Sequence, residues 1–242
     1  MRGAFPISNG MRLHRFYINQ AIQGKEIVIE NKELFHQWRD VFRLNVGSQV
    51  ILFNGDGVEY RSTLVALNFY DTRALVLETT KNSVPTKRSV HLFASLIKKD
   101  NLEWVFEKAT ELGVTQFHPM LSERSEKKNF NIERAEKIII EAVEQSGRGI
   151  LPLLYPLTPL IDTFGQNVFP MFVLHAEGEP FAKVMEWERS NGEVGIFVGP
   201  EGGWSDRELA QFKEKNIPFV SLGTATLRAE TAAIAVATLL LL

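Results

Sequence analysis

Two stretches near the end of the chain decide the fold: IFVGPEGGWS at residues 196–205 and SLGTATLRAETA at residues 221–232. Each begins as an apolar run and ends in a glycine turn, and the turns carry Glu201 and Arg228 as charged groups. Glycine allows a backbone to approach a bound ligand closely, and a nearby carboxylate or guanidinium supplies charge beside it. We therefore expect a ligand site at these turns.

From residue 90 onward, predicted strands alternate with predicted helices. The run Val90–Ile97 is continuously apolar, which is typical of a strand buried on both faces. Further strands are predicted at Val114–Pro119, Met171–Ala176, Val194–Val198 and Phe219–Leu222. Alternating strands and helices predict an α/β fold in which a parallel sheet is covered on both faces.

Capping residues mark the predicted helix ends. The run Asp100–Glu103 has N-cap and capping-box spacing, and Gly113 is placed to end that helix. Asn131 starts the next helix and Gly147 closes it, while Ser205–Glu208 caps a helix between the last two strands. The final apolar run, residues 232–242, is too short to span a bilayer and predicts a buried or subunit-interface helix.

The first part of the chain is β-rich. One helix is predicted near Lys32–Phe42, and Asn54–Gly57 is a strong hairpin signal. Strand-length segments rich in apolar and β-branched residues occur at His14–Ile18, Glu26–Glu30, Gln49–Asn54, Glu59–Leu67 and Arg73–Thr80. Short strands around one helix predict a small β-barrel. The polar, proline-containing run Lys81–Arg88 predicts a linker, so we divide the chain into residues 1–82 and 83–242, with residues 1–10 as an extension before Met11.

Composition narrows the classes of function. The 242 residues include no cysteine, which excludes disulfides, thiolate-bound zinc and a cysteine nucleophile, and the five histidines have no metal-site spacing. No signal peptide or membrane span is expected, so we predict a cytoplasmic protein. Residues 1–90 carry 12 basic against 8 acidic residues, and the rest 15 against 21. A basic front suits a protein that holds a polyanion, although chance gives the same asymmetry.

The ligand site is expected beyond the carboxyl ends of the strands, where open α/β sheets bind ligands. Three loops lie there, at residues 175–178, 199–203 and 223–230. Neither GxGxxG nor GxxxxGK[ST] occurs, and few positive charges are present, so a nucleoside-like cofactor held by backbone groups fits better than a triphosphate. The plainer readings are a turn with a solvated Glu201, and a salt pair between Arg228 and Glu230.

The residues of these turns resemble the ribosomal RNA small-subunit methyltransferase E family. The resemblance rests on Gly199–Gly203 together with Leu222-Gly223 and Leu227–Ala232, and it extends along nearly the whole chain. Further matching blocks follow in the family's order, at residues 14–16, 42–44, 107–114 and 141–152. One departure is Ala225-Thr226, where the family usually has an arginine and an isoleucine.

The resemblance implies an S-adenosylmethionine-dependent enzyme that methylates N3 of a uridine in 16S ribosomal RNA, free or in the small ribosomal subunit. It implies a PUA-like barrel followed by a SPOUT-class α/β domain whose trefoil knot forms the cofactor pocket, in a homodimer. The cofactor-binding residues are then expected to be Leu174, Gly199, Gly202, Leu222, Gly223 and Leu227.

The chemistry of the reaction suggests roles for the charged groups. Uracil N3 carries a proton at neutral pH, so we expect Arg228 to stabilise negative charge on the uracil, and Glu201 or Glu230 to act as the base. Candidate phosphate contacts are Arg15, Arg43, Arg61, Arg124 and Arg148, with Lys127 and Lys128 as weaker ones.

Two other functions stay open at this point. A methyltransferase of the same fold class could act on a ribose 2′-hydroxyl, and a non-catalytic RNA-binding factor for ribosome assembly could retain the fold. A phosphate-binding glycine loop is a weaker alternative, because it lacks a companion lysine.

Overall fold

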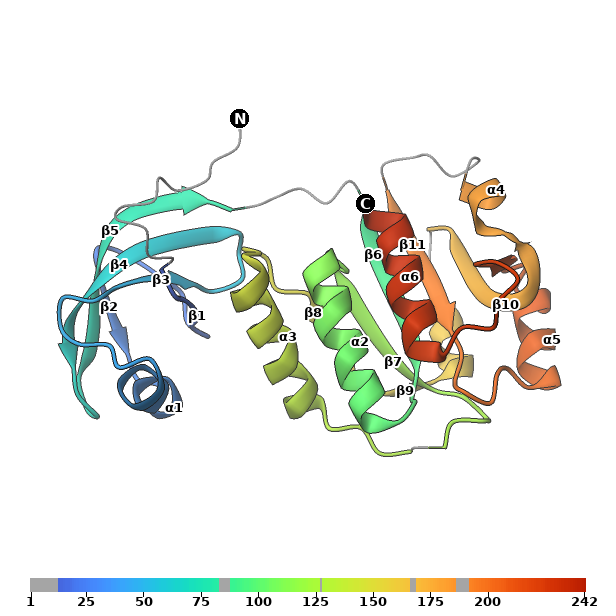
Figure 1. Ribbon diagram of the computed structural model, residues 1–242, viewed down its shortest axis with the longest axis horizontal. Coiled ribbons are helices and arrows are strands. Elements are labelled where there is room, and N and C mark those ends of the chain that lie inside the picture. The colour runs from blue at the N-terminus through green and yellow to red at the C-terminus, as the bar shows by residue number, and fades with distance from the viewer. Residues whose placement is uncertain (1–12, 83–87, 127, 166–168, 186–191) are drawn as a thin grey trace. The chain divides into compact units, whose positions relative to one another are not determined.

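A computed structural model describes residues 13–82, 88–126, 128–165, 169–185 and 192–242. The predicted extension at residues 1–10, most of the predicted linker, and Lys127 lie outside these ranges. The chain divides into two compact units, one made of Met1–Val84 with Glu144–Leu151, and the other of Pro85–Val143 with Pro152–Leu242. Figure 1 labels their helices and strands.

The first unit holds a five-stranded sheet in the order β1-β3-β4-β5-β2. Its elements are β1 (Arg15–Tyr17), β2 (Glu26–Ile29), the helix α1 (Lys32–His36) continued by a π-helical turn (Gln37–Val41), β3 (Gln49–Phe53), β4 (Val58–Leu67) and β5 (Thr72–Lys81). All five predicted strands, the helix and the hairpin between β3 and β4 are confirmed. Within the described residues β1 and β2 are the two ends of the sheet, and no closed barrel is formed.

The core of the first unit is aromatic and aliphatic. Trp38 from the π-helical turn is fully buried, and its ring lies 5.1 Å from that of Phe16 on β1. Asn31 caps α1 by accepting a hydrogen bond from the backbone of Leu34. The helix therefore presents its apolar residues to the concave side of the sheet, where Leu52 and Leu64 are also buried.

A buried ion pair holds the end of α3 (Ile132–Ser146) within this unit. The side chains of Arg15 and Glu59 form a salt bridge and are only 7% and 4% exposed. Arg15 also donates to the carbonyls of Glu144 (3.1 Å) and Arg148 (2.7 Å). Asn82 donates to Glu59 at 2.6 Å and to a carbonyl of the loop after α3 at 2.8 Å. The network explains why residues 144–151 belong to the first unit.

The second unit is built on a parallel sheet in the order β12-β10-β11-β6-β7-β8, with β9 also paired to β7. Its strands are β6 (Ser89–Ser95), β7 (Gln116–Leu121), β8 (Leu153–Leu154), β9 (Thr158–Pro159), β10 (Met171–Pro180), β11 (Glu193–Val198) and β12 (Phe219–Ser221). Its helices, besides α3, are α2 (Lys99–Leu112), a 3-10 turn (Leu160–Phe164), α4 (Phe181–Met185), α5 (Asp206–Glu214) and α6 (Ala229–Leu241). The predicted parallel α/β architecture is confirmed.

Helices cover both faces of this sheet. On one face α2 and α6 lie side by side (Figure 1). On the other, the Phe197 ring of β11 lies 4.4 Å from Phe93 of β6 and 5.1 Å from Phe212 of α5. Successive strand residues point to opposite faces, so the apolar runs of β6 and β11 fill both cores at once.

Strand β10 contacts β12 twice. Val220 of β12 pairs with both Leu174 and Glu179, on either side of a bend in β10. At the bend, a Cβ added to Gly178 would lie 2.5 Å from the Val220 backbone nitrogen. Only glycine allows so close an approach of two backbones, so residues 175–178 cross directly over β12.

The helix ends test the predicted caps. Gly113 ends α2 with φ of 117°, and Ser205 and Glu208 form a complete capping box on α5. The predicted cap at Asp100 is wrong, because α2 begins at Lys99 and the Glu103 side chain pairs with Arg134 of α3 at 3.1 Å. No helix in the described ranges is long and apolar enough to cross a membrane.

Candidate active site

The bend within β10 and the loops after β11 and β12 meet around one cavity of about 710 Å³ at the carboxyl edge of the parallel sheet. The cavity is closed by the β6–α2 connection and by the first turn of α6. All three loops named from the sequence, at residues 175–178, 199–203 and 223–230, contribute to its wall. The strand ends thus bring together residues that are far apart in the sequence.

The glycine loop after β11 is fixed by Trp204. The indole nitrogen of Trp204 donates to the carbonyl of Leu174 at 3.0 Å, which ties this loop to the end of β10. A Cβ on Gly199 would lie 3.0 Å from the Trp204 ring, and Gly203 takes a φ of 68° as its N–H bonds to the carbonyl of Pro200. Glycine suits both positions, since Gly199 has no side chain to collide with the Trp204 ring and Gly203 has a positive φ.

A buried carboxylate holds the neighbouring loop in place. Glu208, on the first turn of α5, is 2% exposed and accepts a hydrogen bond from the backbone of Glu123 at 2.8 Å. The next residue, Arg124, donates to the carbonyl of Gly202 at 3.1 Å. The loop after β7 is therefore anchored to the glycine loop after β11, and Arg124 is placed at the cavity wall.

Glu201 and Glu230 both line the cavity but differ in their surroundings. Glu201 is exposed, and its carboxylate accepts the backbone N–H of Lys98 at 3.0 Å. Glu230 is 6% exposed, and its Oε2 is buried without a hydrogen-bond partner among the described residues. A buried carboxylate oxygen without a partner is unusual in a folded protein.

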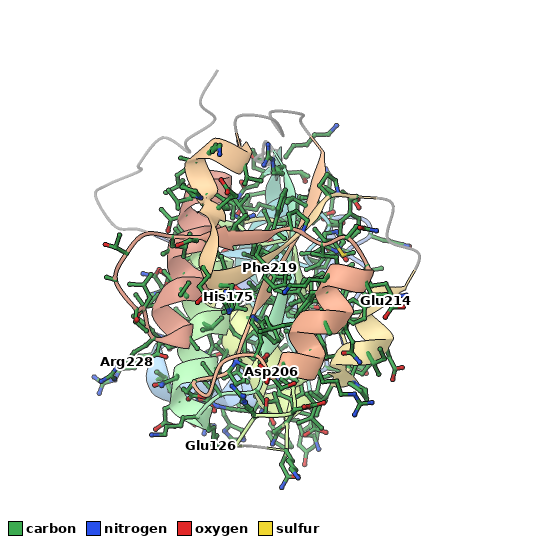
Figure 2. All side chains as sticks on the ribbon, turned by 90° about the vertical axis from the view of Figure 1, so that its right-hand side faces the viewer. Glu126, His175, Asp206, Glu214, Phe219 and Arg228 are labelled. Atoms are coloured by element: carbon green, nitrogen blue, oxygen red, sulfur yellow. The ribbon has the colours of Figure 1, made fainter. Side chains whose placement is uncertain are left out.

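Arg228 precedes α6 as its N-cap residue and is exposed at the cavity wall. In Figure 2 its side chain points outward, away from the ribbon. No ion pair between Arg228 and Glu230 occurs in the part of the chain that the structure describes, so the salt pair considered from the sequence is not formed.

Most residues expected to bind a cofactor lie in the cavity wall: Leu174, Gly199, Leu222, Gly223 and Leu227. Gly202 does not, because its carbonyl is turned to Arg124. The wall also contains Lys98, Asn101 and His175, which the sequence did not single out as ligand-binding residues. Only their positions in the sequence could have indicated a place in the site. Lys98 and Asn101 follow β6, and His175 follows the apolar start of β10.

Comparison with known proteins decides the family. The RNA methyltransferase domain family matches residues 84–241. A ribosomal RNA small subunit methyltransferase E from Rickettsia conorii is 32% identical over 228 residues, covering 93% of each chain. The chain belongs to this family.

Two further relatives agree in sequence and in fold. The ribosomal RNA small subunit methyltransferase E of Bacillus subtilis is 30% identical, covering 91% of this chain and 93% of its own. A solved structure from Legionella pneumophila, described as a methyltransferase with the cofactor SAM bound, has a TM-score of 0.87 and 26% identity. It covers 95% of this chain and 97% of its own.

The arginines expected to contact RNA fall into two groups. Arg43 and Arg124 are exposed, and Arg61 keeps a quarter of its side chain exposed beside Glu78. Arg15 is buried in its ion pair with Glu59, and burial lowers the pKa of the half-buried Arg148. The guanidinium of Arg15 is therefore engaged within the first unit, whereas a phosphate contact by Arg148 stays a prediction. Lys128 is exposed, and Lys127 lies outside the described residues.

Proposed function

We propose that this protein transfers a methyl group from S-adenosylmethionine to N3 of a uridine in 16S ribosomal RNA, free or within the small ribosomal subunit. The observation that carries the proposal is the meeting of three strand-end loops around a cavity lined by Arg228, Glu201 and Glu230. Membership of the methyltransferase E family and the SAM-bound relative support it. The test is nucleoside mass spectrometry of ribosomal RNA from cells with and without the protein. Loss of 3-methyluridine in its absence is expected, and loss of a 2′-O-methyl nucleoside instead would contradict the proposal.

The cavity fits a nucleoside cofactor. Its volume of about 710 Å³ lies within the range of about 300–1,000 Å³ found for small-molecule sites. Gly199 is packed against Trp204, and Gly223 has a φ of 137°, so both backbones are exposed to a ligand without a side chain between. Leu174, Leu222 and Leu227 supply apolar wall. S-adenosylmethionine, when bound, supplies an electrophilic methyl group.

The charged groups of the cavity wall act on the target base of the RNA. Arg228 is exposed and unpaired among the described residues, so it is available to stabilise negative charge on the uracil carbonyls. Glu201 and Glu230 are the carboxylates we propose as candidates to take the N3 proton. Arg228→Ala is expected to leave the cofactor affinity nearly unchanged while methylation falls.

We propose that residues 1–82 bind RNA, that residues 83–242 carry out methyl transfer, and that Arg124 of the second part adds a phosphate contact. Arg43, Arg61 and Arg124 are the phosphate contacts we propose, since all three have exposed guanidinium surface. A PUA-like fold is proposed for the first part on its five-stranded sheet packed with one helix, the sheet being open between β1 and β2. The bend of β10 over β12 supports a SPOUT-class domain with a trefoil knot in the second.

A homodimer formed through α6 completes the proposal. The helix is apolar almost throughout, and only part of it is covered within the unit: Leu239 stays 59% exposed, and Trp104 on the adjacent α2 stays 45% exposed. Exposed apolar side chains on neighbouring helices favour burial against a second copy. The proposed ribosomal RNA substrate supports a cytoplasmic location. Sedimentation equilibrium is expected to give twice the chain mass, and Leu239→Glu is expected to give the monomer.

A further inference from the structure

Glu230 is a buried carboxylate whose Oε2 receives no hydrogen bond from the described residues. It is 6% exposed, it lines the cavity, and no described residue donates a hydrogen bond to its Oε2. It stands in the first turn of the 13-residue helix α6. The partial positive charge of a helix N-terminus favours a negative side chain there. The carboxylate is therefore held in the cavity wall with no donor to its Oε2 among the described residues.

Glu201 is different, because its carboxylate already accepts a backbone hydrogen bond. It accepts the N–H of Lys98, the residue that precedes α2, and so joins the glycine loop to the start of that helix. It is also exposed to solvent, where water competes for its oxygens. The two candidate bases therefore differ in their surroundings. Glu201 is hydrogen-bonded and exposed to solvent, whereas Glu230 is buried and forms no ion pair with the described residues.

We propose that Glu230, and not Glu201, takes the proton from N3 of the target uracil; this rests on the proposed function. The N3–H bond breaks and an O–H bond forms on Glu230. The electron pair stays on N3, and its negative charge spreads onto the two uracil carbonyl oxygens. Arg228, two residues earlier, is placed to stabilise that charge. Glu230 later releases the proton to solvent.

The test uses the full chain with Glu230→Gln, which keeps the size of the side chain and removes the base. Single-turnover methylation at saturating S-adenosylmethionine and RNA is expected to fall about 10²–10⁴-fold, the usual contribution of a general base. Calorimetry is expected to give an S-adenosylmethionine Kd within about threefold of the unmodified protein. Glu214→Gln, an exposed carboxylate at the end of α5 (Figure 2), is the matched control and is expected to change neither quantity.

A second RNA substrate distinguishes a role of Glu230 as general base from a structural role. RNA with 5-fluorouridine at the target position has a more acidic N3, so Glu230→Gln is expected to regain at least tenfold in rate, whereas Arg228→Ala should regain less. Glu230→Asp, which keeps a carboxylate, is expected to be faster than Glu230→Gln. The inference is overturned if Glu230→Gln stays within fivefold of the unmodified rate. A weakened cofactor Kd with no gain from 5-fluorouridine overturns it too, since Glu230 would then bind the cofactor.

The proposed function and the role of Glu230 are refuted by different results. If mass spectrometry of the RNA product from the unmodified protein shows methyl on a ribose oxygen, the uridine-N3 assignment falls whatever Glu230→Gln does. If it shows 3-methyluridine and Glu230→Gln is fully active, only the role of Glu230 falls.

Discussion

Replacing Arg15 by Met should destabilise the first unit strongly. The substitution leaves the Glu59 carboxylate buried at 4% exposure, with Asn82, at 2.6 Å, as its remaining side-chain donor among the described residues. It also removes the donors to the carbonyls of Glu144 and Arg148. Removing one partner of a buried ion pair costs about 3–5 kcal/mol, because the other charge stays buried without compensation. We expect a loss in that range.

Hydrogen exchange measures this loss where it occurs. Peptides from β3, β4 and β5 report the free energy of opening of the first unit, and a loss of about 3–5 kcal/mol corresponds to a fall of about 10²–10⁴-fold in amide protection. Arg73→Met is the matched control, since Arg73 pairs with Asp71 at the surface with 44% of its side chain exposed. An exposed pair contributes about 1 kcal/mol or less.

A double variant tests the cause. Arg15→Met combined with Glu59→Leu removes both charges and should recover more than half of the loss, because apolar groups of similar size replace a buried pair at little cost. The reasoning is refuted if Arg15→Met loses less than about 1 kcal/mol, or if the double variant is no better than the single one. If Arg15→Met bound RNA more weakly while its amide protection against hydrogen exchange stayed unchanged, the result would support the phosphate contact expected from the sequence.

Three further predictions concern the second unit. Gly178→Ala forces a Cβ to within 2.5 Å of the β12 backbone, so it should cost about 1–3 kcal/mol or more and weaken S-adenosylmethionine binding at least tenfold in calorimetry. Gly165→Ala, with no atom within 4 Å, should do neither. Arg228→Ala should reduce methylation about 10²–10³-fold with the cofactor Kd within about threefold, and an unchanged rate would remove its role. Burial lowers the pKa of His118 to about 4, so the unfolded chain binds more protons than the folded one between about pH 6.5 and 4. Stability should therefore fall as the pH drops through that window, by about 1–2 kcal/mol at pH 5 after allowance for solvent screening, and His118→Gln should lose less in urea titrations at pH 7.5 and 5. An equal loss in both proteins would contradict it.

The secondary structure was largely predictable because local signals and tertiary packing agree. Gly113 and Ser205 end and begin their helices as their chemistry dictates. Asp100 failed as a cap because Glu103, the reciprocal member of the box, is drawn to Arg134 on another helix. The sequence spacing contained no sign of that competing partner.

The site was predictable in outline and not in detail. Apolar runs located the strand ends, and strand ends located the cavity, so Gly199, Gly223 and Arg228 were found. His175 was named only as part of the loop at residues 175–178, because its place in the wall depends on how β10 bends over β12. Arg15 looked like a surface cation, since its partner Glu59 lies 44 positions away.

The bend of β10 over β12 has a consequence for assembly of the protein. In the knotted arrangement proposed above, residues 175–178 cover the last strand, so either the tail passes beneath them or they close over it afterwards. A large, rapidly folding protein fused after Leu242 would obstruct the first route and leave the second unaffected. The refolding rate of such a fusion, set against that of the same partner joined at the other terminus, reports which event comes last.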